Sequence, residues 1–179
     1  MTQIADDVLK AMVDCREAIM NLEQEYEKKR DDLNVPFRVE LEKLLVERQP
    51  LIASINWGNV LDNPDAPTKP FLNGTTDGKI LRAIESFKVT TSVRDGAIFR
   101  KIEMKLKSNV FVESHELFRE VDACDKTVSV SGIKWKPGTE KSRSDSLFRF
   151  FDESVKSEEL LIDAVTAFEI VFQNPYLWL

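Results

Sequence analysis

The N-terminal quarter of the chain carries an apolar stripe at the spacing of an α-helix. From Ile4 to Leu44, apolar side chains recur every three or four residues, and mostly charged residues lie between them. Arg30 alone takes a stripe position that an apolar residue would otherwise fill. The spacing predicts one helix of roughly 40 residues and about 60 Å, with a continuous apolar strip along its length.

A chain of 179 residues is too compact to cover such a strip alone, because a domain of this size has a radius of gyration of about 16 Å. A second copy of the helix is the expected cover, so the sequence predicts a homodimer. The stripe leaves parallel and antiparallel pairing open. We expect the interface to consist of Ile4, Val8, Met12, Cys15, Ile19, Leu22, Tyr26, Leu33, Phe37 and Leu41.

Pro36 lies inside the predicted helix. A proline in a helix interior removes one backbone hydrogen bond and disfavours helical geometry in the preceding residue. We therefore expect either a kink or a short loop that divides two helices at this point. The predicted division of the chain is a dimerisation helix at residues 1–50 and a globular domain at residues 51–179.

The middle of the chain alternates apolar and polar residues as β-strands do. Residues 87–93 and 98–106 show this alternation, and the dipeptide Asp95-Gly96 between them is typical of a tight hairpin turn. Residues 110–112 and 117–121 indicate a further strand, and residues 127–135 indicate the last one. The sequence thus predicts an antiparallel sheet of about four strands, and an α+β fold once the flanking helices are included.

The C-terminal segment is predicted to be helical and strongly acidic. Phe148 and Phe151 mark a short helix, while Leu161, Ala164 and Phe168 form the buried face of a final helix. Residues 145–179 hold seven acidic and two basic residues, which gives this segment a net charge of −5 out of −6 for the chain. A pI near 5.0 disfavours direct binding of nucleic acid, sequence-specific binding included, because phosphates require a basic surface. It favours basic protein partners.

Catalysis is not expected, and neither is a cofactor or a metal. No glycine-rich phosphate-binding motif occurs, and no motif places a nucleophile beside His115, which is the only histidine. The longest apolar runs are too short to span a membrane, and no secretory signal pattern follows Met1, so an intracellular protein is expected.

Several segments together resemble one known family. They are RQPLIASINW at 48–57, the hairpin at 87–121, IKWKPG at 133–138, SLFRFFDES at 146–154 and the closing FQNPYLWL. Spread over nearly the whole chain, they resemble the nucleosome assembly protein family of histone chaperones, in particular its shorter SET-like branch. The long acidic C-terminal tail of that family is not among these 179 residues.

The resemblance implies an antiparallel helix pair with a globular domain below each end, which gives a headphone-shaped dimer. It also implies a non-catalytic histone chaperone that binds core histones and assists nucleosome assembly or disassembly. A nuclear location with shuttling to the cytoplasm, and chromatin-modifying enzymes as further partners, belong to the same expectation. An interaction scaffold, or a regulator of a chromatin enzyme or phosphatase, stays open as the alternative.

Acidic residues are the expected histone-binding groups, because a collective negative field attracts lysine- and arginine-rich proteins. We expect the apolar residues of the C-terminal segment to anchor it and to present its acids outward. The predicted binding residues are Asp152, Glu153, Glu158, Glu159, Asp163 and Glu169, with Glu116 and Glu120 as secondary candidates.

Overall fold

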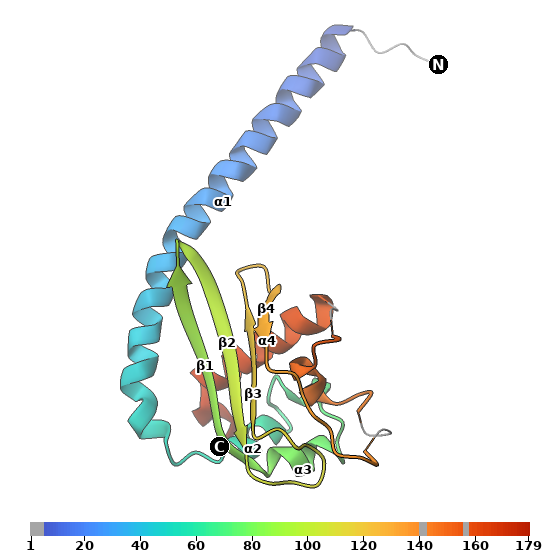
Figure 1. Ribbon diagram of the computed structural model, residues 1–179. Coiled ribbons are helices and arrows are strands. Elements are labelled where there is room, and N and C mark those ends of the chain that lie inside the picture. Colours follow the sequence, from blue (N-terminus) through green and yellow to red (C-terminus); the bar gives the residue numbers. More distant parts are fainter. Residues whose placement is uncertain (1–5, 140–142, 156–157) are drawn as a thin grey trace.

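The computed structural model describes residues 6–139, 143–155 and 158–179, and Figure 1 shows a long helix beside a four-stranded sheet. This arrangement confirms the predicted α+β class. In chain order the elements, with η marking a 3₁₀-helix, are α1 (Asp6–Arg48), η1 (Gln49–Ile52), α2 (Trp57–Asp62), η2 (Lys69–Phe71), α3 (Asp77–Leu81), β1 (Ile84–Arg94), β2 (Ala97–Leu106), β3 (Glu116–Val121), β4 (Thr127–Val130), η4 (Leu147–Phe151), α4 (Glu158–Gln173) and η5 (Pro175–Trp178).

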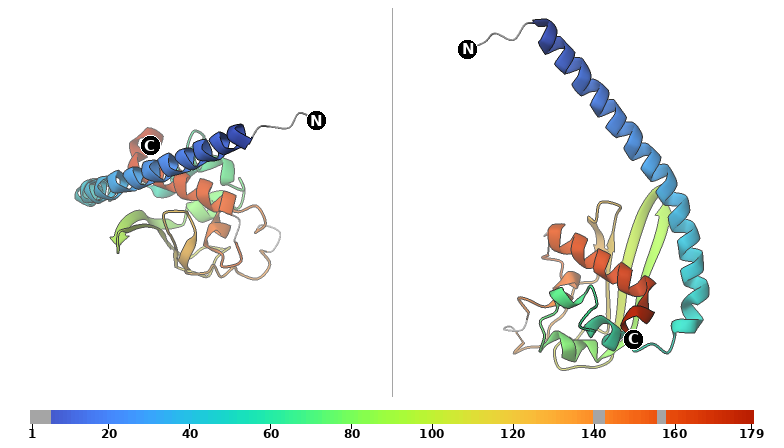
Figure 2. Two further views of the ribbon diagram at one scale, coloured as in Figure 1. Left: turned by 90° about the horizontal axis from the view of Figure 1, so that it is seen from above. Right: turned by 180° about the vertical axis from the view of Figure 1, so that it is seen from behind.

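The helix α1 runs without interruption for 43 residues and contains Pro36. A loop dividing two helices, one of the two predicted alternatives, is therefore wrong. Figures 1 and 2 show that α1 changes direction where it comes level with the tip of the β1–β2 hairpin. The missing proline N–H weakens the hydrogen-bond ladder locally, which bends a helix without ending it.

The four strands form an antiparallel meander in the order β1-β2-β3-β4, as predicted. Asp95 and Gly96 connect β1 to β2, and their φ angles of 53° and 76° match the two-residue turn that suits the twist of a hairpin. Beyond β4, Gly132 has a φ of 71°, and the ladder ends. The predicted strand at 127–135 is therefore too long. The strand expected to include residues 110–112 begins only at Glu116, and Val112 forms only an isolated bridge with Trp135.

One face of the sheet forms the core, and Figure 2 shows α4 lying across that face. Phe87 of β1 contacts Phe168 of α4 with ring centroids 5.7 Å apart, and Trp57 of α2 contacts Phe87 at 5.2 Å. Leu161, Ala164 and Phe168 are buried as predicted. Each ring removes a large apolar area from water, so these contacts fix α4 against the sheet.

Polar contacts attach the C-terminal part of α1 to two neighbouring elements, β1 and the end of α4. Glu42 accepts a hydrogen bond of 2.9 Å from the backbone N–H of Thr91 on β1, the edge strand of the sheet. The guanidinium of Arg48 donates to the carbonyl oxygens of Phe172 and Gln173 at 2.7 and 2.6 Å. These contacts hold this half of α1 against β1 and the end of α4, while the N-terminal half projects away (Figure 2).

Candidate functional site

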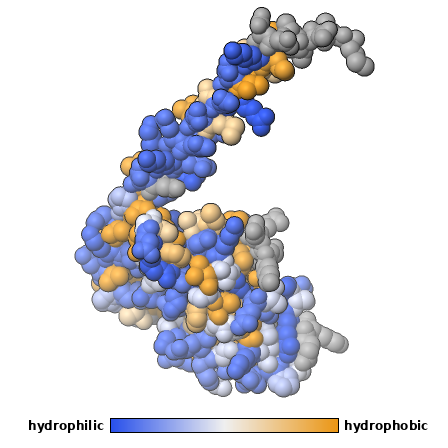
Figure 3. Space-filling model, turned by 45° about the horizontal axis from the view of Figure 1, so that its top comes forward, coloured by the Kyte–Doolittle hydropathy of each residue, from blue (hydrophilic) through white to orange (hydrophobic). Residues whose placement is uncertain are grey.

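The apolar stripe of α1 is uncovered over the projecting half of the helix. Leu22 is 68% exposed and Leu33 is 74% exposed, and Figure 3 shows hydrophobic residues on this helix among hydrophilic ones. Leu41 is half-buried, and Ile4 lies outside the described residues. The other predicted interface residues, all exposed, are Val8, Met12, Cys15, Ile19, Tyr26 and Phe37.

The predicted histone-binding acids do not all share one environment. Glu153 and Asp163 are exposed and Asp152 is half-buried, while the side chains of Glu158 and Glu159 lie outside the described residues. Within this group, Glu153 and Asp163 thus have the exposure that binding a partner requires.

The two secondary candidates lie on the outer face of the sheet and have basic neighbours. Glu116 forms an ion pair of 2.9 Å with Lys105, and the hydrogen bond from that ammonium lowers the pKa of the exposed Glu116 carboxyl. Glu120 forms an ion pair of 2.6 Å with Arg94. Each carboxylate would have to exchange an internal cation for one on a partner, which reduces its net contribution to binding.

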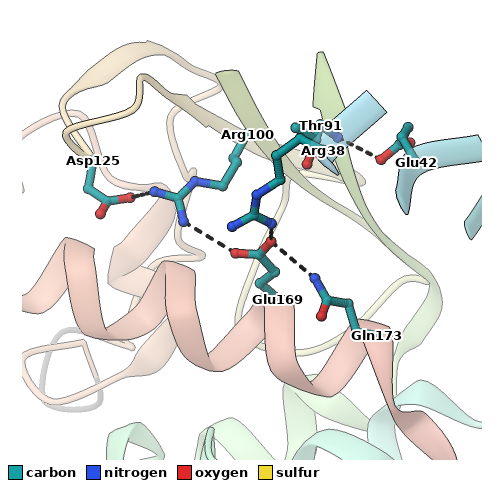
Figure 4. A network of polar contacts seen from close by, with 7 residues as sticks. All are labelled: Arg38, Glu42, Thr91, Arg100, Asp125, Glu169 and Gln173. Atoms are coloured by element: carbon teal, nitrogen blue, oxygen red, sulfur yellow. Dashed lines mark hydrogen bonds and ion pairs between the residues drawn. The ribbon is translucent and has the colours of Figure 1, made fainter. Parts of the chain in front are cut away.

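Glu169 does not face solvent, so the expectation that it is presented outward is wrong. It is buried on α4 at 9% exposure and forms an ion pair with Arg38 of α1 (Figure 4). Its second carboxylate oxygen lies 3.2 Å from Arg100 of β2, while the Gln173 side-chain amide donates at 3.1 Å to the oxygen that pairs with Arg38. Glu169 therefore joins three elements of the fold.

The same network continues to the turn between β3 and β4. Arg100 forms an ion pair with Asp125 (Figure 4), whose φ of 59° is the left-handed conformation that aspartate tolerates in turns. Burial raises the pKa of the Asp125 carboxyl, and the neighbouring Arg100 opposes that rise. The buried charges compensate one another, as burial requires.

Sequence reasoning missed this network, although one signal was available. Arg100 pairs with Thr91 and Val121 in the sheet register, so it shares the inward face with Ile102 two residues later. A charged residue at an inward strand position indicates a buried partner, because an unpaired charge there is costly. Arg119 of β3 is a second case, at 1% exposure, with its guanidinium donating to the Phe150 and Asp152 carbonyls and to Thr127.

The described residues offer no evident catalytic or metal centre. Within these ranges, no group of three or more His, Cys, Asp or Glu side chains could hold a metal ion. The ring Nδ1 of His115 lies 3.1 Å from the Leu106 carbonyl oxygen, and Cys15 and Cys124 are free and exposed. No helix in the part that the structure describes combines the length and apolar character of a membrane span.

The comparisons with known proteins point to one fold. Neither a protein-family model nor a curated protein sequence matches the chain. Among solved structures, Ccp1 matches with a TM-score of 0.61 at 20% identity, over 89% of this chain and 96% of that chain. A nucleosome assembly protein from Plasmodium falciparum matches with a TM-score of 0.55 at 16% identity, over 98% of this chain and 95% of that chain.

Vps75 matches with a TM-score of 0.53 at 13% identity, over 97% of both chains. The matches to the Plasmodium falciparum protein and to Vps75 span 98% and 97% of this chain and therefore include the long helix, the sheet and the C-terminal helix. At these identities the likeness is one of fold: this chain has the fold of the nucleosome assembly proteins.

Proposed function

We propose that this protein is a histone chaperone that binds core histones and assists nucleosome assembly or disassembly. The observation that carries the proposal is the fold that it has in common with a nucleosome assembly protein over nearly its whole length. The concentration of negative charge in residues 145–179 supports the same function, since histones are basic proteins. Nuclear location, with shuttling to the cytoplasm, belongs to the proposal.

The proposed mechanism is reversible competition with DNA and involves no chemical step. Exposed carboxylates such as Glu153 and Asp163 would make charge-assisted contacts with histone lysines and arginines. Because exposed ion pairs are individually weak, histones could leave for DNA whenever the specific nucleosome contacts become available. Nonspecific aggregation of histones with DNA would meanwhile be suppressed.

In this proposal the protein forms a homodimer, with residues 1–50 as the dimerisation helix and residues 51–179 as the histone-binding domain. Its support is the exposed stripe on α1, which the chain's own globular part leaves uncovered. The position of Arg30 favours antiparallel pairing. In a parallel pair the two Arg30 side chains would face each other across the seam, whereas an antiparallel pair whose centre lies away from Arg30 separates them.

A plasmid supercoiling assay with purified core histones tests the proposed function. A chaperone should increase the number of supercoils introduced per plasmid over histones alone at physiological salt. A matched reaction with an unrelated acidic protein of similar pI controls for nonspecific charge. No supercoiling beyond that control, together with retained binding to a chromatin enzyme or phosphatase, would favour the alternative of a scaffold or regulator.

A further inference from the structure

A cleft of 330 Å³ lies where α1, the start of β2 and the turn between β3 and β4 meet. Its polar lining residues are Arg30, Asn34, Arg38, Arg100 and Cys124. We call it the arginine cleft. Among the side chains that the structure describes, every charged one along this lining is basic, although the chain as a whole has a net charge of −6.

The ion pairs behind the arginine cleft orient two of its guanidinium groups. Arg38 and Arg100 both contact the carboxylate of Glu169 (Figure 4), and Arg100 also pairs with Asp125. Neither carboxylate is among the described residues that line the cleft. Because these pairs already restrict the two arginines, a ligand that binds them would lose little further side-chain freedom.

Both oriented arginines keep hydrogen-bond donors in reserve. A guanidinium has five N–H groups. Within the described ranges, Arg38 donates one hydrogen bond, to Glu169, and Arg100 donates two, to Glu169 and Asp125. The remaining N–H groups of these half-buried side chains have no acceptor among the same residues. Water or a bound anion therefore has to accept from them.

The number of donors in the arginine cleft favours a phosphate group over a carboxylate. Arginine binds both kinds of oxyanion through two parallel hydrogen bonds. A carboxylate has only two oxygens, whereas a phosphate monoester has three terminal oxygens and a charge of about −1.5 to −2. Three arginines and the side-chain amide of Asn34 can thus all contact one phosphate group. The volume of 330 Å³ lies at the low end of the range for small-molecule pockets, about 300–1,000 Å³.

We propose that the arginine cleft binds the phosphate group of a small molecule. The site would give Arg30 a role that the apolar stripe does not, since Arg30 is the residue that interrupts the stripe. This binding is separate from the proposed histone binding and does not depend on it.

Isothermal titration calorimetry with pyrophosphate, on the full chain at physiological salt, tests this proposal. The test variant combines Arg30→Gln with Asn34→Asp, which removes one cation and adds one carboxylate without touching the partners of Glu169. It should bind pyrophosphate at least about tenfold more weakly than the wild type, because charge-assisted hydrogen bonds are lost and a like charge is added. Circular dichroism and light scattering check that the fold and the oligomeric state are kept.

The matched control combines Arg82→Gln with Asn59→Asp. It makes the same two kinds of substitution at exposed positions, at the end of the globular part away from the projecting half of α1 (Figure 1). It should bind pyrophosphate within about twofold of the wild type, because exposed charges this far away are screened. Equal loss in both variants, or no loss in the test variant, would overturn the proposal. Equal or tighter wild-type binding of a glutamate peptide would overturn the assignment to phosphate.

Cys124 locates the bound anion independently, because its exposed thiol lines the cleft. At a pyrophosphate concentration ten times the dissociation constant, only about one cleft in eleven stays empty. Modification of Cys124 by N-ethylmaleimide should then slow several-fold, while that of Cys15, the other cysteine, should not change. Binding without protection of Cys124 would place the anion elsewhere and contradict the proposal. Histone affinity, measured in parallel, reports separately on the proposed chaperone function.

Discussion

Arg38 of α1 forms an ion pair with Glu169 of α4, although 131 positions separate them in the sequence. Arg38 comes two residues after Pro36, at the start of the half of α1 that packs on the sheet and α4. The pair therefore fastens the long helix to the globular part close to the proline.

Replacing Glu169 with Gln should destabilise the fold by roughly 2–3 kcal/mol, because Arg38 and Arg100 would lose a carboxylate that is largely shielded from water. Urea unfolding measures the loss. The exposed Glu153→Gln variant is the control and should change stability by less than about 0.5 kcal/mol. Non-additivity of Arg38→Met with Glu169→Gln in a double-mutant cycle would confirm the pairing; simple additivity would argue against it.

Gly58 of α2 should not tolerate a side chain. A Cβ at this position would lie 2.2 Å from the backbone oxygen of Leu81, which cannot move as a flexible side chain could. Gly58→Ala should therefore cost roughly 1–3 kcal/mol, even though alanine is the better helix former. Gly74→Ala is the matched control, because nothing lies within 4 Å of its added Cβ. Thermal unfolding compares them, and equal midpoints would refute the close approach.

Asp77 should contribute to stability as a hydrogen-bond acceptor. Its carboxylate accepts from the Ser146 hydroxyl and from the N–H groups of Leu147 and Asn73, at 2.7 and 2.9 Å for the two N–H groups. In an asparagine at this position, the side-chain NH₂ would face one of these donors and could not accept its hydrogen bond. Asp77→Asn should therefore destabilise the protein by roughly 1–3 kcal/mol at neutral pH.

The pH dependence of this effect has a definite sign. Burial raises the pKa of Asp77 above 3.8, so the folded state holds the proton more tightly than the unfolded chain. The additional stability that comes from this pKa shift is fully present below 3.8 and is lost as the pH rises through the folded pKa. The difference between wild type and Asp77→Asn should be larger near pH 3.8 than at neutral pH. Chemical unfolding at both pH values measures it; a smaller difference at low pH would contradict the assignment.

Charge in the stripe of α1 should prevent dimerisation. The double substitution Ile19→Glu and Leu22→Glu places two charges in each helix of the proposed seam. Burying an unpaired charge there would cost roughly several kcal/mol. Asn21→Glu with Gln24→Glu is the matched control, because the helical repeat puts these two positions on the opposite face. Light scattering should report a monomer for the first variant and a dimer for the second. A dimer in both would exclude the stripe as the interface.

Local patterns in the sequence predicted the elements that local interactions determine. Asp95-Gly96 predicted the hairpin because only a tight turn with positive φ joins two strands in two residues. The apolar stripe predicted α1 from an equally local signal, because helical spacing is visible within a few turns. The strand expected to reach Trp135 ended earlier, because the conformation of Gly132 depends on the path that the chain takes afterwards.

The network around Glu169 could not be predicted in the same way. The sequence pattern predicts that the acids on α4 form a solvent-exposed face. Nothing near Glu169 in the sequence indicates that it is buried while Asp163 is exposed. Its burial depends on Arg38 and Arg100, which reach it only after α1 and β2 have packed against α4. The inward register of Arg100 was the available sign that a carboxylate partner existed, but it did not identify which one.

The affinity for core histones as a function of salt tests the central proposal most directly. We expect tight binding at physiological salt, where screening has removed the binding of unrelated basic proteins. Reversing Glu158, Glu159 and Asp163 to Lys should weaken histone binding by about tenfold, because several charge-assisted contacts, each worth under about 1 kcal/mol, would be lost together. Reversing the exposed Asp65, Glu85 and Glu113 to Lys should change it by less than about twofold. Histone binding that disappears with salt in step with that of other basic proteins would contradict the proposed function.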